Sequence, residues 1–230
     1  MILPRPRRAP RRIPLWAWHL DAWIRGGRKG SRPSRAPKRP PAWFHWWRIW
    51  RLARVKGKGS WAWRTYLHHI RAQQDAAARL QTARTALVNW ARWGAGHEPA
   101  IHYSMGLARD DYLHVPRARL PIWTDCSGFV TYCYWAAGIP DPSGLDYRYV
   151  GFTGTLLENA AKHGRVLFDL SQARPGDPIV IGPGTGWHAV IVIEAGPDPL
   201  VVSHGSEAGP RIERISQDPR TPKRVCQTLS

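Results

Sequence analysis

The sequence lacks a disulfide framework, a long apolar run and, in its first third, acidic residues. Only three cysteines occur in 230 residues: Cys126, Cys133 and Cys226. An odd, small number of cysteines fits a reduced compartment or a free reactive thiol. No run of about 18 apolar residues is present, so no transmembrane helix is predicted. The apolar stretch 13–24 contains His19 and Asp21 and no small-residue cleavage site follows it, so no secretory signal is expected.

The shortage of acidic residues at the N-terminus sets the charge distribution. Residues 1–71 contain 19 Lys and Arg residues but a single acid, Asp21, whereas residues 72–230 contain 15 basic and 15 acidic residues. The whole net charge of +18 therefore lies in the first third, which also holds nine of the fourteen tryptophans. Two segments of different composition are joined in one chain.

The basic segment predicts little regular structure. Residues 1–41 are rich in Pro, Arg and Gly and poor in apolar side chains, so we expect them to be disordered. Residues 42–55, "AWFHWWRIWRLARV", predict one Trp-rich amphipathic helix with a basic stripe, of the kind attracted to an anionic membrane or wall polymer. A solvated neutral tail, a nucleic-acid-binding segment and a stretch upstream of the true start are the alternative interpretations. No nucleic-acid-binding fold is visible, so no specific nucleic acid is expected.

The rest of the chain predicts helices followed by an antiparallel meander of strands, which is an α+β domain. We expect helices over 63–93, 126–137 and 155–163, an irregular loop over 97–123, and strands over 166–170, 178–181, 188–194, 200–204 and 211–215. The predicted organisation is a basic Pro/Arg/Trp-rich extension (1–60), a connecting helix (61–74), a catalytic domain (75–216) and a C-terminal tail (217–230).

One group of residues suggests nucleophilic chemistry. Cys126 begins a predicted helix, where unpaired backbone N–H groups favour a thiolate, so we expect a lowered thiol pKa. Gly128 lets the backbone approach closely. His188 begins an alternating strand and can act as a base, and His204, at the end of the next strand, can orient its imidazole. Cys133 is interpreted as a core residue and Cys226 as incidental in a polar tail.

These segments resemble the NlpC/P60 family of cysteine peptidases. "TDCSGFV" at 124–130 resembles that family's nucleophile motif, "RPGDPIVIGPGTGWHAVIVIE" at 174–194 resembles its Pro-Gly-Asp strand and histidine strand, and "LVVSHG" at 200–205 resembles the strand of its third residue. The resemblance covers roughly residues 80–210. Within this range the local sequence is similar to that of peptidase modules of actinobacterial phage lysins.

The resemblance implies a papain-like α+β fold that hydrolyses a peptide bond in the peptidoglycan stem. It implies that Cys126 is the nucleophile, His188 the base and His204 the orienting residue. Glu207 or a backbone carbonyl is an alternative to His204. It also implies that the Cys126 N–H helps to form an oxyanion hole. The residues that it implies near the substrate are Asp125, Ser127 and Tyr103, and we expect Glu207 to bind substrate as well.

Other activities stay open. Papain-like sites also support amide hydrolysis at the sugar–peptide junction, as an N-acetylmuramoyl-L-alanine amidase, and acyl transfer. A rival of another class is a cationic, Trp-rich membrane-disrupting protein. "HEPAIH" at 97–102 has the wrong spacing for a zinc site, and "GPGTG" at 182–186 lies between strands, so no cofactor or metal is expected. We expect a monomer, made in a host cytoplasm and acting on the bacterial wall after release, or carried in a virion.

Overall fold

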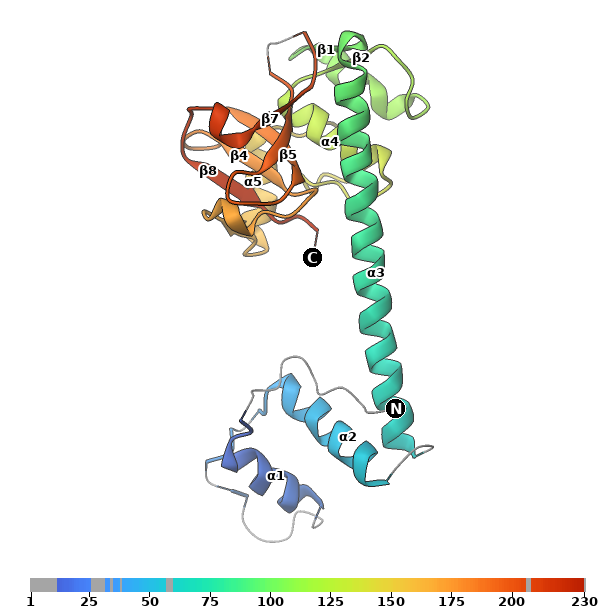
Figure 1. The fold of residues 1–230 in the computed structure, drawn as a ribbon, viewed down its shortest axis with the longest axis vertical. Helices are drawn as coiled ribbons and strands as arrows, with labels where there is room; N and C mark the ends of the chain where they lie inside the picture. Colours follow the sequence, from blue (N-terminus) through green and yellow to red (C-terminus); the bar gives the residue numbers. More distant parts are fainter. Residues whose placement is uncertain are drawn as a thin grey trace. The chain divides into compact units, whose positions relative to one another are not determined.

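The chain forms two compact units in a computed structural model, residues 1–77 and residues 78–230. The structure describes residues 12–25, 32–33, 35–37, 39–56, 60–205 and 208–229. One long helix, α3 (Trp61–Gly96), begins in the N-terminal unit and ends in the C-terminal unit (Figure 1). Ser60 caps it by accepting a hydrogen bond from the Trp63 N–H at 3.1 Å.

The N-terminal unit is built from helices that share a tryptophan-rich core. Helix α1 (Leu15–Arg25) packs against α2 (Ala42–Lys56) through Ala17, Leu20, Phe44 and Trp47. A second cluster joins α2 to the start of α3. The only acid of the segment, Asp21, is 2% exposed and pairs with arginines of both helices: Arg25, Arg48 and Arg51.

Two expectations for this unit need correction. Residues 15–25 form a helix rather than a disordered stretch, because Leu20 and the neighbouring indoles find an apolar partner surface on α2. The predicted helix over 42–55 is present as α2, but its apolar side is not free. Phe44 and Trp47 are 3% and 1% exposed. The remaining residues predicted to be disordered lie largely outside the described part of the chain. Within that part, no helix is both long and apolar enough to span a bilayer.

The C-terminal unit confirms the predicted α+β class. Its helices are the end of α3, α4 (Cys126–Ala136) and α5 (Thr153–Lys162), with short 3₁₀ turns at Glu98–Ala100, Leu107–His114, Leu170–Gln172 and Ile215–Gln217. Its strands are β1 (Ile101–Tyr103), β2 (Ile122–Thr124), β3 (Val166–Leu167), β4 (Pro178–Ile181), β5 (His188–Glu194), β6 (Leu200–Ser203), β7 (Arg211–Arg214) and β8 (Lys223–Cys226).

The main sheet has six strands in the order β3-β8-β4-β5-β6-β7, all pairs antiparallel. Strands β4 to β7 form the predicted meander. Strand β8 was not expected: it inserts between β3 and β4, so residues 223–226 belong to the sheet and not to a tail. The predicted loop 97–123 also contains structure, because β1 and β2 form a two-stranded parallel sheet.

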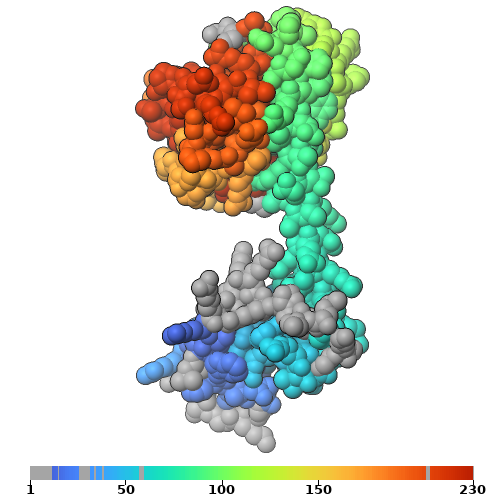
Figure 2. All heavy atoms as spheres, in the orientation of Figure 1, coloured from blue at the N-terminus to red at the C-terminus, as the bar shows by residue number. Residues whose placement is uncertain are grey.

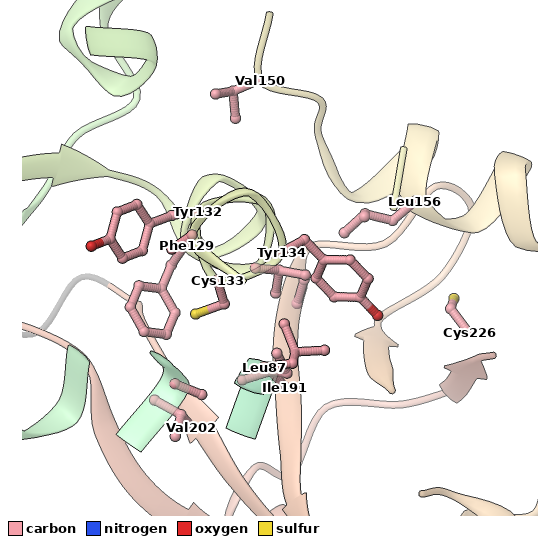
Figure 3. Close-up of a cluster of buried hydrophobic side chains, with 14 of the residues drawn as sticks. Leu87, Phe129, Tyr132, Cys133, Tyr134, Val150, Leu156, Ile191, Val202 and Cys226 are labelled. Carbon is pink, nitrogen blue, oxygen red and sulfur yellow. The ribbon is translucent and has the colours of Figure 1, made fainter. Parts of the chain in front are cut away.

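Helix α4 is buried against one face of the main sheet. Phe129 and Cys133 of α4 point towards Ile191 of β5 and Val202 of β6, while Leu87 of α3 closes the cluster (Figure 3). Cys133 is fully buried, in agreement with its interpretation as a core residue. Cys226 is also fully buried, so its assignment to a polar tail was wrong. The residues that face the other side of the sheet, among them Val190 and Val201, form a second core.

The C-terminal half of α3 is fastened to this unit by a buried ion pair. Arg84 Nη1 lies 2.8 Å from Asp177 Oδ1 and 2.7 Å from the Pro175 carbonyl, and Arg84 Nη2 lies 2.8 Å from the Leu229 carbonyl. Figure 2 shows the green residues of this half of α3 directly beside the orange and red residues of the sheet. The Asp of the "RPGD" segment therefore has a structural role, because it anchors the helix that precedes the site.

Candidate active site

The start of α4 is a capped helix N-terminus. The Asp125 carboxylate accepts a hydrogen bond from the Gly128 N–H at 2.6 Å, and the Asp125 carbonyl accepts one from the Phe129 N–H at 2.8 Å. A Cβ atom at position 128 would lie 2.2 Å from Thr124 Oγ1, so only glycine fits there. The cap leaves Cys126 as the first residue of the helix, with its side chain at the positive end of the macrodipole.

The Cys126 thiol lies beside the first residues of β5. Backbone hydrogen bonds from Ala189 and from Ser127 reach the sulfur and lower its pKa. Burial and the negative charge of Asp125 act in the opposite direction and dominate, so that the pKa of Cys126 is raised to about 11. This corrects the expectation of a lowered pKa: the thiol is protonated at neutral pH and needs a base to remove its proton.

The base candidate, His188, precedes the residue that contacts the thiol. Its side chain is buried, at 3% exposure, and its Nε2 lies 2.9 Å from Ser203 Oγ on the neighbouring strand. Ser203 pairs with Val190 in the β5–β6 ladder, so Ser203 and His188 lie on the face of the sheet that carries Val190, opposite to the face that α4 covers. The alternation of the strand therefore does not bring His188 to the side of Cys126, and its part in a thiol reaction stays a prediction. Asp218 lies on the same side as His188. Burial alone would raise the pKa of Asp218. Hydrogen bonds from Arg220 and the charge of His188 outweigh burial, so the pKa of Asp218 is lowered.

His204 lies in a different environment from the one predicted. Successive residues of a strand point to opposite faces, so His204 faces away from the side on which Ser203 meets His188. Its Nε2 lies 3.0 Å from the Thr124 carbonyl, and its ring packs edge-on against Tyr103 and Phe129. His204 therefore joins β6 to β2 and α4, and Ser203 Oγ lies within hydrogen-bond distance of His188 Nε2.

Three of the four predicted substrate-binding residues, Tyr103, Asp125 and Ser127, lie next to the start of α4 or to the strand that leads into it. Tyr103 of β1 lies opposite Thr124 of β2 in the parallel ladder, and Thr124 directly precedes Asp125, the cap of α4. Asp125 and Ser127 are both engaged by a residue that the sequence did not suggest: Arg109 Nη2 lies 2.9 Å from Asp125 Oδ2 and 3.3 Å from Ser127 Oγ. Glu207 lies outside the described residues.

Three residues of this site were missed from the sequence: Ser203, Asp218 and Arg109. Ser203 and His204 are adjacent polar residues at the end of one strand, and only the register of β5 and β6 decides which of them meets His188. Arg109 lies in a 3₁₀ turn within a segment that looked irregular, and Asp218 in the predicted tail. Among the described residues no cluster of three or more His, Cys, Asp or Glu side chains could hold a metal ion.

The comparisons with known proteins find remote similarity to solved structures. No protein-family model matches the chain, and no curated protein does. The chain is similar to a hypothetical invasion protein of Mycobacterium tuberculosis, Rv1477, with 20% identity and a TM-score of 0.44 over 64% of this chain and 63% of that one. It is also similar to the peptidoglycan hydrolase RipB of M. tuberculosis, with 16% identity and a TM-score of 0.42 over 91% of this chain and 80% of that one. The first match spans less than two thirds of the solved chain.

Proposed function

We propose that this protein is a cysteine endopeptidase of the NlpC/P60 type that cuts a peptide bond in the stem of bacterial peptidoglycan. One observation carries the proposal: the Cys126 sulfur lies at a capped helix N-terminus and beside the backbone of Ala189, the residue that follows His188. His188 is itself held by Ser203. A nucleophile, a base and an orienting group in this order form the constellation of thiol hydrolysis. The "TDCSGFV" motif supplies the substrate class.

The reaction is the one that the NlpC/P60 resemblance implies for these residues. In it His188, whose imidazole has to turn to the α4 side of the sheet, takes the thiol proton as the Cys126 sulfur attacks the scissile carbonyl carbon, and the negative charge moves to the carbonyl oxygen. The Cys126 N–H belongs to the first turn of α4, where backbone donors have no intrahelical partner, and we propose that it stabilises that oxyanion. When the C–N bond breaks, the imidazolium gives its proton to the leaving amine. Water then cleaves the thioester by the same route, and His188 again accepts and returns a proton.

The test of this function is turbidity clearing of purified cell walls by the full chain and by Cys126→Ala. We expect the substitution to lower the rate by at least about a thousandfold, since the nucleophile is removed. Cys133→Ala is the matched control, because it removes a thiol from the same helix but from the core. Equal clearing by wild type and Cys126→Ala would refute the proposal.

Product analysis separates the endopeptidase from the other reactions that this fold supports. Mass spectrometry of digested muropeptides should show cleavage between two stem residues. Release of the complete stem from the sugar would assign an amidase, and a new peptide linkage an acyltransferase. We further propose that the enzyme is a phage lysin that reaches the wall after release or within a virion. The similarity of the segments "PDPSG" and "VVSHGSE" to phage lysin modules supports this proposal.

We propose that the N-terminal unit holds the enzyme on an anionic envelope polymer by charge. The basic surplus of residues 1–71 supports this, whereas the burial of Phe44 and Trp47 argues against insertion of the apolar side of α2 into lipid. Binding of the full chain to purified anionic wall polymer should weaken steeply between about 50 and about 200 mM salt. Salt-independent binding, or leakage of anionic liposomes caused equally by Cys126→Ala, would favour the membrane-disrupting rival.

A further inference from the structure

Arg109 connects three segments at the start of the nucleophile helix. Its Nη2 lies 3.1 Å from Asp125 Oδ1, 2.9 Å from Asp125 Oδ2, 3.3 Å from Ser127 Oγ and 2.6 Å from the Gly151 carbonyl. The Arg109 side chain is 18% exposed and that of Asp125 is 10% exposed. Little water therefore screens this ion pair, and its acid, Asp125, directly precedes Cys126 in the sequence.

The bonds of Asp125 show that its charge is held by the protein. Oδ1 also accepts hydrogen bonds from Ser127 Oγ at 2.9 Å and from the Gly128 N–H at 2.6 Å. The carboxylate is thus committed to capping α4 and to binding Arg109. A buried carboxylate next to a nucleophilic thiol opposes the formation of a thiolate, since two negative charges would lie close together. A cation beside the Asp125 carboxylate would reduce this repulsion, and the Arg109 guanidinium occupies that position.

We propose that Arg109 is a positioning residue of the nucleophile: its guanidinium offsets the charge of Asp125 beside Cys126 and clamps the start of α4 to the Gly151 segment. The proposal rests on the proposed role of Cys126. It extends that role, because it names the group that lets the chain use a carboxylate cap without suppressing the thiolate.

The electrostatics of the thiol support this assignment. After burial, the charge of Asp125 is the strongest influence that raises the pKa of Cys126, and the charge of Arg109 acts to lower it. Without Arg109 the Asp125 charge would act unopposed, and the pKa of the thiol would rise further. Without both charged groups both influences disappear, and because Asp125 acts more strongly than Arg109, the pKa would not rise. A purely structural clamp would not show this compensation.

The experiment measures alkylation of Cys126 by iodoacetamide in the full chain at about pH 8. Below its pKa a thiol reacts in proportion to its thiolate fraction, so a rise of one pKa unit slows the reaction about tenfold, or about threefold after the gain in nucleophilicity. We expect Arg109→Gln to react about three- to tenfold more slowly and Asp125→Asn to react faster than the wild type. The double variant should react at least as fast as the wild type, because the Asp125 influence that it loses is the stronger of the two. Reactivity of the other two cysteines is subtracted with Cys126→Ala.

Two further variants control for charge and for folding. Arg119→Gln removes an exposed arginine from the loop after the same 3₁₀ turn and should leave the rate unchanged. Arg109→Lys keeps the cation and should recover most of the rate, and if Arg109→Gln does not fold, Arg109→Lys and Asp125→Asn decide the question. A folded Arg109→Gln protein with the wild-type rate would overturn the proposal, as would a double variant as slow as Arg109→Gln. Because no wall substrate is used, these outcomes are independent of the test of the proposed function.

Discussion

The two units bury a carboxylate in contrasting ways. In the N-terminal unit Asp21 binds three arginines, and one of them, Arg51, also stacks over Trp18 with its Cζ 4.2 Å from the ring centroid. In the C-terminal unit Asp177 has one buried partner, Arg84, and two backbone carbonyls complete the hydrogen bonds of that arginine. The first arrangement leaves a surplus of positive charge and the second is neutral. The difference shows that the chain keeps its positive surplus in one unit and a neutral, buried ion pair in the other.

The largest effect that we expect from this contrast is the pH dependence of Cys126. Because burial raises its pKa to about 11, the alkylation rate should increase about a thousandfold between pH 7 and pH 10. A raised pKa means that the protonated thiol predominates at neutral pH, so no plateau should appear there. Alkylation kinetics across this range, corrected with Cys126→Ala, provide the measurement. A plateau near pH 7 would indicate an imidazolium–thiolate pair with His188 and a more open site than the structure has.

The neutral ion pair of the C-terminal unit should govern its stability. Arg84→Ala leaves Asp177 buried without its cation, and we expect a loss of about 3 kcal/mol in the free energy of unfolding. Burial already raises the pKa of Asp177, so protonation of the carboxyl limits the loss. Urea unfolding followed by far-UV circular dichroism measures it.

Arg92→Ala is the matched control, because Arg92 lies on the same helix and pairs with Glu194, but both side chains are about half exposed. It should cost less than about 1 kcal/mol. Equal losses for the two variants would mean that the buried pair does not fasten α3 to the sheet.

The sequence predicted those elements whose signals lie within their own residues, and it missed those that depend on distant partners. Helix α4 and strands β4 and β5 have their signals within their own residues: a capped start with Cys126 and Gly128, a "PGD" turn, and an alternating apolar run. Strand β8 has only "KRVC", and its partners β3 and β4 lie more than 40 residues earlier, so no local pattern indicates that pairing. Helix α1 was missed because Pro and Arg surround it, and its apolar residues acquire a partner only when α2 is present.

The surplus charge of the N-terminal unit should make its fold depend on one acid. Asp21→Asn removes the anion shared by Arg25, Arg48 and Arg51, and we expect the unit to lose about 2 kcal/mol, since these arginines are partly exposed. Urea unfolding followed by tryptophan emission reports on this unit, which holds nine of the fourteen tryptophans. Asp75→Asn, an exposed acid on α3, is the control. An unchanged transition in Asp21→Asn would show that the indole contacts alone hold α1 to α2.

The smallest effect distinguishes Ser203 from its neighbour His204 in the C-terminal unit. Ser203→Ala removes the hydrogen bond to His188 Nε2, and we expect kcat/KM on soluble stem peptides to fall about tenfold, the value of one buried hydrogen bond. Ser203→Thr keeps an oxygen at this position and should recover part of the rate. His204→Gln loses the ring contacts with Tyr103 and Phe129, so its effect should appear mainly as lower thermal stability. If His204→Gln instead abolished turnover in a stable protein while Ser203→Ala retained full activity, the orienting role would return to His204. The register of β5 and β6 would then have to shift by one residue in the active enzyme, since a shift of one residue moves His204 to the face that His188 occupies.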